Sequence, residues 1–268
     1  MLFRSSMAIS ALEKEVGGPL FDRKNKRLYL NERGLFLYEK MTPLIEETAD
    51  HIQNLKKGLI SGKLTIGAST TIGNYVLPQL ISEFLNQQII KTKQDIDIQL
   101  VIENTATIEE KLKKYDLDMA LVEGPITDHT QLMTKPWIED ELIIITHEPI
   151  RALTQQNLKT LSKEKWVLRE SGSGTRTVLS QILDQSNIQL TNTMTMGHTE
   201  AVKQAVKAGL GISCLSKLSV QQELDQNTLF QIPTTEKLSR TLSIVTAKNR
   251  YETRLQTIFL SFLNATYL

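Results

Sequence analysis

The sequence has almost no cysteine, which limits the chemistry that the chain supports. A single cysteine, Cys214, occurs in 268 residues. One cysteine excludes an intrachain disulfide and a zinc site built from cysteines, and it favours a reducing compartment, so we predict a cytoplasmic protein. The four histidines are scattered without the spacing of metal ligands. We therefore predict neither a metal nor a cofactor.

Long apolar runs and net charge are also absent. No run approaches the roughly 18 apolar residues of a membrane-spanning helix, and the start lacks the apolar core of a signal peptide. The 31 lysines and arginines nearly balance the 30 aspartates and glutamates. We therefore expect no membrane partner, and contact with nucleic acid only through a local patch. The 40% of hydrophobic residues is enough for two or three compact units.

A local basic patch stands near the start of the chain. Residues 23–27 hold four cations in five positions, and the alternating Leu28-Tyr29-Leu30 follows. This pattern predicts a basic hairpin tip that leads into a short strand, with a solvated turn as the alternative. Before it, apolar residues at helical spacing predict a short helix over residues 5–16, ended by Gly17-Gly18-Pro19.

Residues 32–58 have the pattern of one long helix with an apolar seam. Tyr38, Ile45 and Ile52 fall seven residues apart, as in helices that pair along their length. This spacing predicts a dimer, and a helix that packs on its own domain is the alternative. Pro43 inside the run predicts a kink or a restart of the helix.

From residue 63 onward, strand and helix patterns alternate, which predicts an α/β fold. Helices are expected over residues 71–86 and 107–114, between short apolar runs. The strands are expected over residues 63–67, 97–102, 119–122, 141–146, 166–169 and 193–197. Regular alternation of this kind predicts parallel sheets, with ligands bound beyond the carboxyl ends of the strands.

Small hydroxyl residues are concentrated in the loops that follow three of these strands. The loops are Ala68–Thr71, Asn104–Thr107 and Glu170–Arg176, and each one opens a predicted helix. Free N–H groups at helix starts, together with hydroxyls and glycines, form a socket for a carboxylate, sulfate or phosphate. Arg169 or Arg176 would supply a full positive charge. The alternative is that these residues only cap their helices.

Three stretches of the first part carry a family resemblance. In order, residues 2–10, 19–23 and 30–34 resemble the recognition helix, the wing and the first linker turn of LysR-type transcriptional regulators. That module has a first helix with no counterpart here, and about four further residues between Ser10 and Ala11. Because the first helix of such a module crosses the DNA backbone, we expect a partial winged helix-turn-helix with impaired binding to promoter DNA.

The second part resembles the same family. Residues 69–73, 121–125 and 169–176 are similar to the effector-binding domain of the branch that regulates carbon fixation and sulfur assimilation. The resemblance covers nearly all of the chain. It implies a fold in which a partial winged helix-turn-helix and a linker helix precede a two-lobed effector domain like a type 2 periplasmic binding protein.

The resemblance also implies a division into domains. We predict the partial winged helix-turn-helix at residues 1–31, a linker and dimerisation helix at 32–60, and the effector-binding domain at 61–268. Within this last domain, lobe one takes residues 61–138 and 240–268, and lobe two takes residues 139–239. Two crossing segments would form a hinge that a ligand closes.

The predicted site residues form two sets. A small anionic effector in the interlobe cleft would contact Ser69, Thr70, Thr71, Thr105, Glu123, Ser171, Gly172, Ser173, Gly174, Thr175, His198 and Thr199. DNA would contact Ser5, Ser6, Ser10, Arg23, Lys24, Lys26, Arg27 and Arg33. His198 replaces the serine or asparagine more usual in the family, and its protonation would make anion binding depend on pH near 6.5.

Catalysis has little support in the sequence. The segment Gly172-Ser173-Gly174 lacks the lysine of a phosphate-binding loop, the third glycine of a dinucleotide fingerprint and the pattern of a nucleophile elbow. We therefore predict a regulator that is not an enzyme and that forms a homodimer or homotetramer. The alternatives are an effector-binding remnant that does not bind DNA, or an enzyme or solute-binding protein on the same scaffold.

Overall fold

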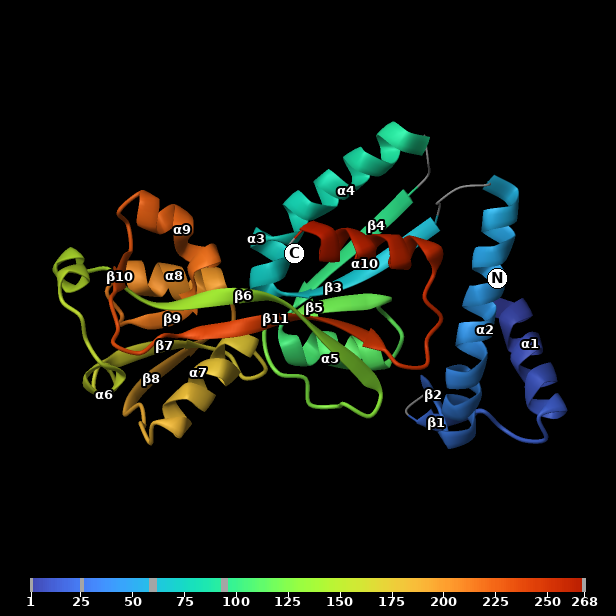
Figure 1. Ribbon diagram of the computed structural model, residues 1–268. Helices are drawn as coiled ribbons and strands as arrows, with labels where there is room; N and C mark the ends of the chain where they lie inside the picture. Colours follow the sequence, from blue (N-terminus) through green and yellow to red (C-terminus); the bar gives the residue numbers. More distant parts are fainter. Residues whose placement is uncertain (1, 25–26, 58–61, 93–95, 267–268) are drawn as a thin grey trace.

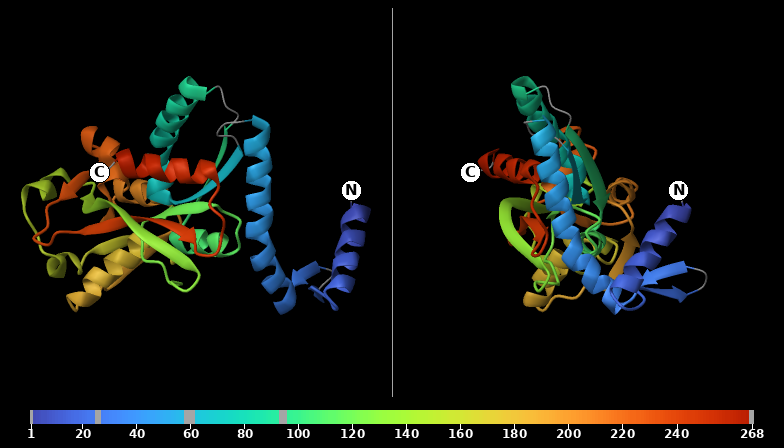
Figure 2. Two further views of the ribbon diagram at one scale, coloured as in Figure 1. Left: turned by 45° about the vertical axis from the view of Figure 1, so that its right-hand side comes forward. Right: turned by 90° about the vertical axis from the view of Figure 1, so that its right-hand side faces the viewer.

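The computed structural model describes residues 2–24, 27–57, 62–92 and 96–266. Its elements form three groups along one axis, which are an N-terminal arm and two α/β lobes (Figure 1). None of the helices in these residues is long and apolar enough to cross a membrane. The arm projects to one side of the lobes and does not pack around them (Figure 2).

The N-terminal arm consists of two helices and a hairpin. Helix α1 (Leu2–Glu15) precedes the antiparallel strands β1 (Phe21–Lys24) and β2 (Arg27–Leu30), and helix α2 (Glu32–Lys57) follows. The predicted short helix, basic hairpin and long helix are thus confirmed. The predicted restart at Pro43 is wrong, because α2 runs through this proline as one helix.

The first lobe is built on a mixed sheet with helices on both faces. Strand β3 (Gly62–Ser69) pairs in parallel with β4 (Ile96–Glu103) and with β5 (Met119–Val122). Helices α3 (Thr70–Tyr75), α4 (Leu77–Thr92), α5 (Thr105–Lys113) and α10 (Arg254–Thr266) surround these strands (Figure 1). Phe84 of α4 and Phe259 of α10 meet edge to face in its core, with ring centroids 5.0 Å apart.

The second lobe surrounds a smaller set of strands. Strands β7 (Lys165–Arg169) and β8 (Asn192–Met196) form a parallel pair. Strands β9 (Ser213–Ser216) and β10 (Phe230–Ile232) pair with one end of the long strand β6 (Leu132–Thr146). The surrounding helices are the 3-10 helix Pro149–Leu153, α6 (Leu158–Leu161), α7 (Gly174–Gln185), α8 (Thr199–Lys207) and α9 (Lys217–Asp225). Trp166 is fully buried at its centre.

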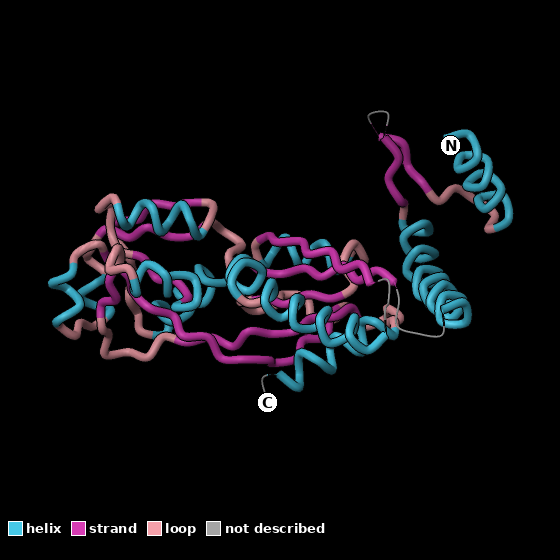
Figure 3. Tube along the Cα trace, turned by 90° about the horizontal axis from the view of Figure 1, so that it is seen from above, coloured by secondary structure: helices cyan, strands magenta, loops and turns pink. Residues whose placement is uncertain are grey.

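Two long antiparallel strands join the lobes. Strand β6 and strand β11 (Ser239–Ala247) lie side by side across the boundary (Figure 3). In their register, Arg240 is opposite Asp140. The prediction of parallel sheets is therefore only partly right, since both β6 and β11 run antiparallel to their partners. The periodicity of apolar residues identifies a strand, but it does not show whether the neighbouring strand runs parallel or antiparallel to it.

Several contacts anchor the long helix of the arm to the first lobe. The Tyr251 hydroxyl and the Arg254 N–H donate to Asp50 of α2, and one arginine makes the largest set of contacts. Arg250, in the loop between β11 and α10, binds both carboxylate oxygens of Glu46 on α2, at 2.7 and 3.1 Å. The same guanidinium binds Asp118 at 2.5 Å and donates to the carbonyls of Tyr115 and Leu117. These partners belong to the connection between α5 and β5 and to α2, so Arg250 joins the first lobe to the arm.

Candidate anion-binding site

The hydroxyl loops of the first lobe meet at the carboxyl ends of β3 and β4. Ser69 begins α3 without capping it, because its hydroxyl instead lies 3.1 Å from the Thr105 hydroxyl and accepts the Glu123 N–H at 3.1 Å. The structure therefore joins three loops that are separate in the sequence. All three residues are buried, so these polar groups stabilise one another away from water.

An inner ionic cluster lies directly behind this contact. The Glu123 carboxylate accepts N–H groups of Thr71 and Ile72 at the start of α3, and it binds Arg240 at 3.0 Å. Arg240 also donates to Thr175 at 2.8 Å and to Asp140 at 2.7 Å. Its side chain is 1% exposed, so the cluster is closed to solvent. The positive start of α3 is thus already neutralised by a carboxylate of the protein.

Asp140 is the acidic member of the inner cluster whose pKa is shifted by burial. Burial raises the pKa of Asp140, and the nearby Arg240 only partly opposes this effect. Ser216 donates a hydrogen bond to Asp140 at 2.7 Å and stabilises the charged form. The result is a buried network that depends on Arg240, because the charge of Arg240 faces two carboxylates.

An outer cluster stands at the boundary between the lobes, around Arg169. This arginine ends β7, and its side chain is only 2% exposed. It donates to the hydroxyl of Thr199 on α8 at 2.5 Å and to the hydroxyl of Thr70 on α3 at 3.3 Å. One guanidinium therefore connects hydroxyls from both lobes, next to the starts of two helices.

Glu170 neutralises the charge of the outer cluster. Its two carboxylate oxygens accept from Nε and Nη2 of Arg169 at 2.8 and 2.9 Å. Burial raises the pKa of Glu170, but the hydrogen bonds and charge of Arg169 outweigh this effect and bring the pKa below its usual range. Asn104 of the first lobe donates to the same carboxylate at 3.5 Å. At neutral pH Glu170 is therefore a charged partner of Arg169.

The backbones of the two lobes also touch here. The Ala106 N–H donates to the Gly172 carbonyl at 3.2 Å, and Gly172 adopts a φ of +88° that favours glycine. A Cβ atom added to Gly174 would lie 2.7 Å from the Gly124 nitrogen and 2.7 Å from the Thr105 hydroxyl. Glycine at position 174 is therefore needed for this close approach.

We expect Gly174→Ala to push the lobes apart at this contact. Since the obstructing atoms include backbone, relief requires a shift of the loop, and the overpacking destabilises the protein by about 1–3 kcal/mol. Urea unfolding followed by tryptophan fluorescence measures the change. Gly197→Ala is the matched control, because an added Cβ there meets no atom within 4 Å. Equal stability of the two variants would contradict the proposed contact.

The remaining predicted effector residues differ in how deeply they are buried. Ser173 is buried and begins α7, but its side chain makes no capping hydrogen bond. Ser171 and His198 are exposed, and His198 begins α8 without capping it. The structure thus brings Ser69, Thr70, Thr71, Thr105, Glu123, Gly172, Gly174, Thr175 and Thr199 into direct contacts at the boundary. Ser171 and His198 lie at its exposed edge.

The sequence reasoning missed two members of the inner cluster, Arg240 and Asp140. Along the sequence, they stand beside the predicted lobe crossings and far from any hydroxyl loop. One feature of the sequence could have identified Arg240, because it is a lone arginine among the small and apolar residues on either side of Leu242. A charged residue within a buried strand needs a partner, and that requirement predicts an ionic cluster without identifying the other members.

The predicted DNA-contacting residues lie in the arm. Ser10 on α1, Arg27 on β2 and Arg33 on α2 are exposed, and Arg33 donates to the Val16 carbonyl at 2.7 Å. Lys26 lies outside the described residues. Four further residues have their backbone in α1 or β1, and their side chains lie outside the description. They are Ser5, Ser6, Arg23 and Lys24. Their contact with DNA stays a prediction.

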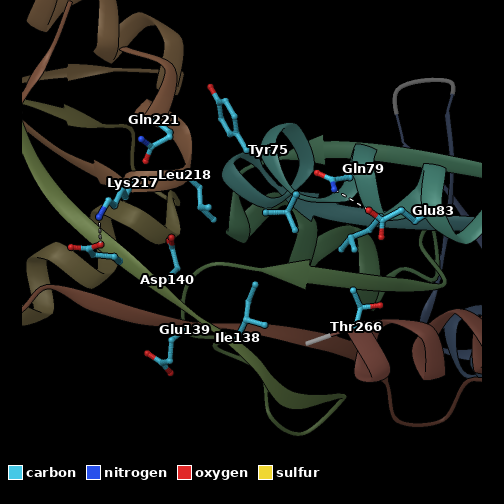
Figure 4. Close-up of a pocket in the computed structure, with 13 residues that line it drawn as sticks. Tyr75, Gln79, Glu83, Ile138, Glu139, Asp140, Lys217, Leu218, Gln221 and Thr266 are labelled. Atoms are coloured by element: carbon cyan, nitrogen blue, oxygen red, sulfur yellow. Dashed lines mark hydrogen bonds and ion pairs between the residues drawn. The ribbon is translucent and has the colours of Figure 1, made fainter. Parts of the chain in front are cut away.

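A separate cavity of about 630 Å³ lies between α4 and α9 (Figure 4). Two pairs of its polar side chains contact each other, since Lys217 donates to Glu141 at 2.9 Å and Gln79 donates to Glu83 at 2.9 Å. None of the predicted effector residues lines it. The cavity therefore adjoins the inner cluster through Asp140, which lines it, and none of its lining residues belongs to the outer cluster around Arg169.

Comparison with known proteins agrees with this architecture. The family described as LysR substrate binding domain matches residues 57–267. The HTH-type transcriptional regulator YeiE of Escherichia coli is 34% identical over 249 residues, which cover 90% of this chain and 82% of that protein. A probable RuBisCO transcriptional regulator of Synechocystis is 32% identical, over 95% of this chain and 75% of that protein.

A solved structure supports the fold of the two lobes. The Synechocystis CcmR regulatory domain in complex with 2-PG superposes with a TM-score of 0.69 at 23% identity. The match covers 78% of this chain and 98% of that one. The two lobes therefore have the fold of that regulatory domain.

Proposed function

The chain belongs to the LysR family of transcriptional regulators, and from that premise we propose that it senses a small anion held by Arg169 between the lobes. The anion is of the carboxylate, sulfate or phosphate type. The observation that carries this proposal is the buried Arg169 guanidinium, which reaches Thr70 of one lobe and Thr199 of the other. A guanidinium is suited to these anions because its N–H groups match two oxygens at once.

The division into lobes supports this proposal. Two hydrophobic clusters contain residues of the ranges 64–138 and 242–263, and two others contain residues of the range 142–238. These separate cores support the predicted lobes 61–138 with 240–268 and 139–239. An anion that bridges Arg169 and both threonines therefore acts between two independently packed bodies, and its binding favours their closed arrangement.

The arm supports a role as the output of the sensor. Arg250 connects α2 to the first lobe through Glu46, and exposed apolar side chains on α2, such as Phe36 and Ile45, supply a surface for a second copy. We propose that the copies pair through this helix in the cytoplasm. Closure of the lobes then changes the position of the two arms and of the basic hairpins that they carry. Weakened DNA binding by this chain stays a prediction.

The experiment that tests the proposal is calorimetric titration of the whole chain with candidate anions at constant ionic strength. The probes are sulfate, inorganic phosphate, 2-PG and a set of small carboxylates. We expect saturable binding of at least one of them, with one site per chain. Absence of binding for all the probes, in a protein whose circular dichroism shows a folded α/β chain, would refute the proposal.

A further inference from the structure

Glu170 occupies the face of Arg169 that an anionic ligand needs. Its carboxylate engages Nε and Nη2 at 2.8 and 2.9 Å, which is the side-on paired geometry that a carboxylate, sulfate or phosphate adopts on arginine. The remaining contacts of the guanidinium go to the neutral hydroxyls of Thr70 and Thr199. The negative charge at this site is therefore supplied by the protein itself.

The two members of this pair are buried to different degrees. The Arg169 side chain is 2% exposed and anchored by contacts to both lobes, whereas Glu170 is 22% exposed. Glu170 also belongs to the loop before α7, where Gly172 has a positive φ. The arginine is thus the fixed partner, and the glutamate is the one that can turn toward solvent when another anion arrives.

A buried guanidinium requires an anionic partner whether or not a ligand is present. Removing the only carboxylate from a buried pair leaves an uncompensated charge, which is strongly destabilising. Glu170 meets this requirement in the ligand-free protein. Through the Asn104 amide at 3.5 Å it also reaches the first lobe, as a bridging ligand would.

We propose that Glu170 is a built-in competitor of the effector, a tethered carboxylate that holds the anion position on Arg169 and yields it when the effector binds. This inference rests on the proposed function, because it concerns the same arginine. It adds a regulatory property: the affinity for the effector is set by exchange of one anion for another, so the Glu170 contact determines the effector concentration at which the protein responds. Effectors with two oxygens in one plane replace both hydrogen bonds and compete best.

The test is the affinity of Glu170→Gln for sulfate and inorganic phosphate, measured by calorimetry at constant ionic strength. The amide cannot form a charged pair with Arg169, so the guanidinium is free for the added anion. We expect the dissociation constant to fall about tenfold, since a hydrogen-bonded charge pair no longer has to be broken. Glu170→Ala removes the same carboxylate and must tighten binding in the same direction.

Glu148→Gln is the matched control, because it makes the same charge change at an exposed position of the second lobe. It should change the affinity less than twofold. If the wild-type chain binds either anion and the Glu170 variants bind it equally or more weakly, the competitor role is overturned while the proposed function stands. If neither the wild-type chain nor any variant binds sulfate, inorganic phosphate, 2-PG or the small carboxylates while all remain folded, both proposals fail. Binding that appears only in the Glu170 variants supports the competitor role most directly.

Discussion

Replacing Arg240 with methionine is expected to destabilise the protein by about 3–5 kcal/mol, because it removes the cation from a buried cluster and leaves its two carboxylates in place. Glu123 and Asp140 are each 2% exposed, and Arg240 binds both of them. Methionine fills similar space but cannot neutralise either charge. Equilibrium unfolding in urea, followed by tryptophan fluorescence, measures the loss.

The control is Arg151→Met on the surface of the second lobe. Arg151 pairs with Glu164, which is 42% exposed, at 3.1 Å. A pair of this kind contributes about 0–1 kcal/mol, because water screens it. The cost of Arg240→Met should also decrease as the pH is lowered from 7, since burial raises the pKa of Asp140 and its protonation removes one uncompensated charge. A loss below 1 kcal/mol for Arg240→Met at pH 7 would show that the cluster does not depend on this arginine.

Replacing Arg169 with glutamine is expected to weaken anion binding about a hundredfold. The substitution removes the full charge and the paired N–H groups at once, and hydrogen bonds to charged groups contribute about 1.5–3 kcal/mol. Arg169→Lys keeps the charge but loses the fork geometry, so we expect a smaller loss of about tenfold. Calorimetry with sulfate and inorganic phosphate measures both changes.

Arg176→Gln is the comparison that identifies which arginine holds the anion. Arg176 donates to the Arg169 carbonyl at 2.9 Å and to the Thr195 hydroxyl at 3.4 Å, and within the described part of the chain it makes no hydrogen bond to Thr70 or Thr199. We expect Arg176→Gln to bind anions within about threefold of the wild type, because a charge on the periphery is screened by solvent. The reverse order of the two losses would transfer the anion site to Arg176.

The geometry gives a physical route from anion binding to the arm. Arg169 and Thr70 connect the second lobe to α3, which follows β3 directly. In the middle of the same strand, the Thr65 N–H donates to Asp118 at 2.5 Å, and Asp118 shares Arg250 with Glu46 of α2. Under the proposed function, a shift of the first lobe at the anion site would act through these contacts on the helix that carries the hairpin.

The sequence alone was enough to predict many of the strands and the loops that follow them. The alternating strand and helix patterns predicted β3, β4, β5, β7 and β8 within a residue or two of their observed ends. The hydroxyl loops followed the correct strands, because capping and turn preferences are local properties of the chain. Two of the loops therefore meet at the carboxyl ends of the neighbouring parallel strands β3 and β4, and the third reaches them from the separate β7–β8 sheet of the second lobe.

Only the tertiary structure decided which charges meet. Arg169 and Thr70 are 99 residues apart, Arg240 and Glu123 are 117 apart, and Arg250 and Glu46 are 204 apart. Such pairs arise where β6 and β11 cross between the lobes and where α2 returns to the first lobe, and local periodicity carries no information about either event. The same limit applies to Glu123, whose carboxylate lies against Arg240 because burial of one charge requires the other. Its contact with an effector stays a prediction.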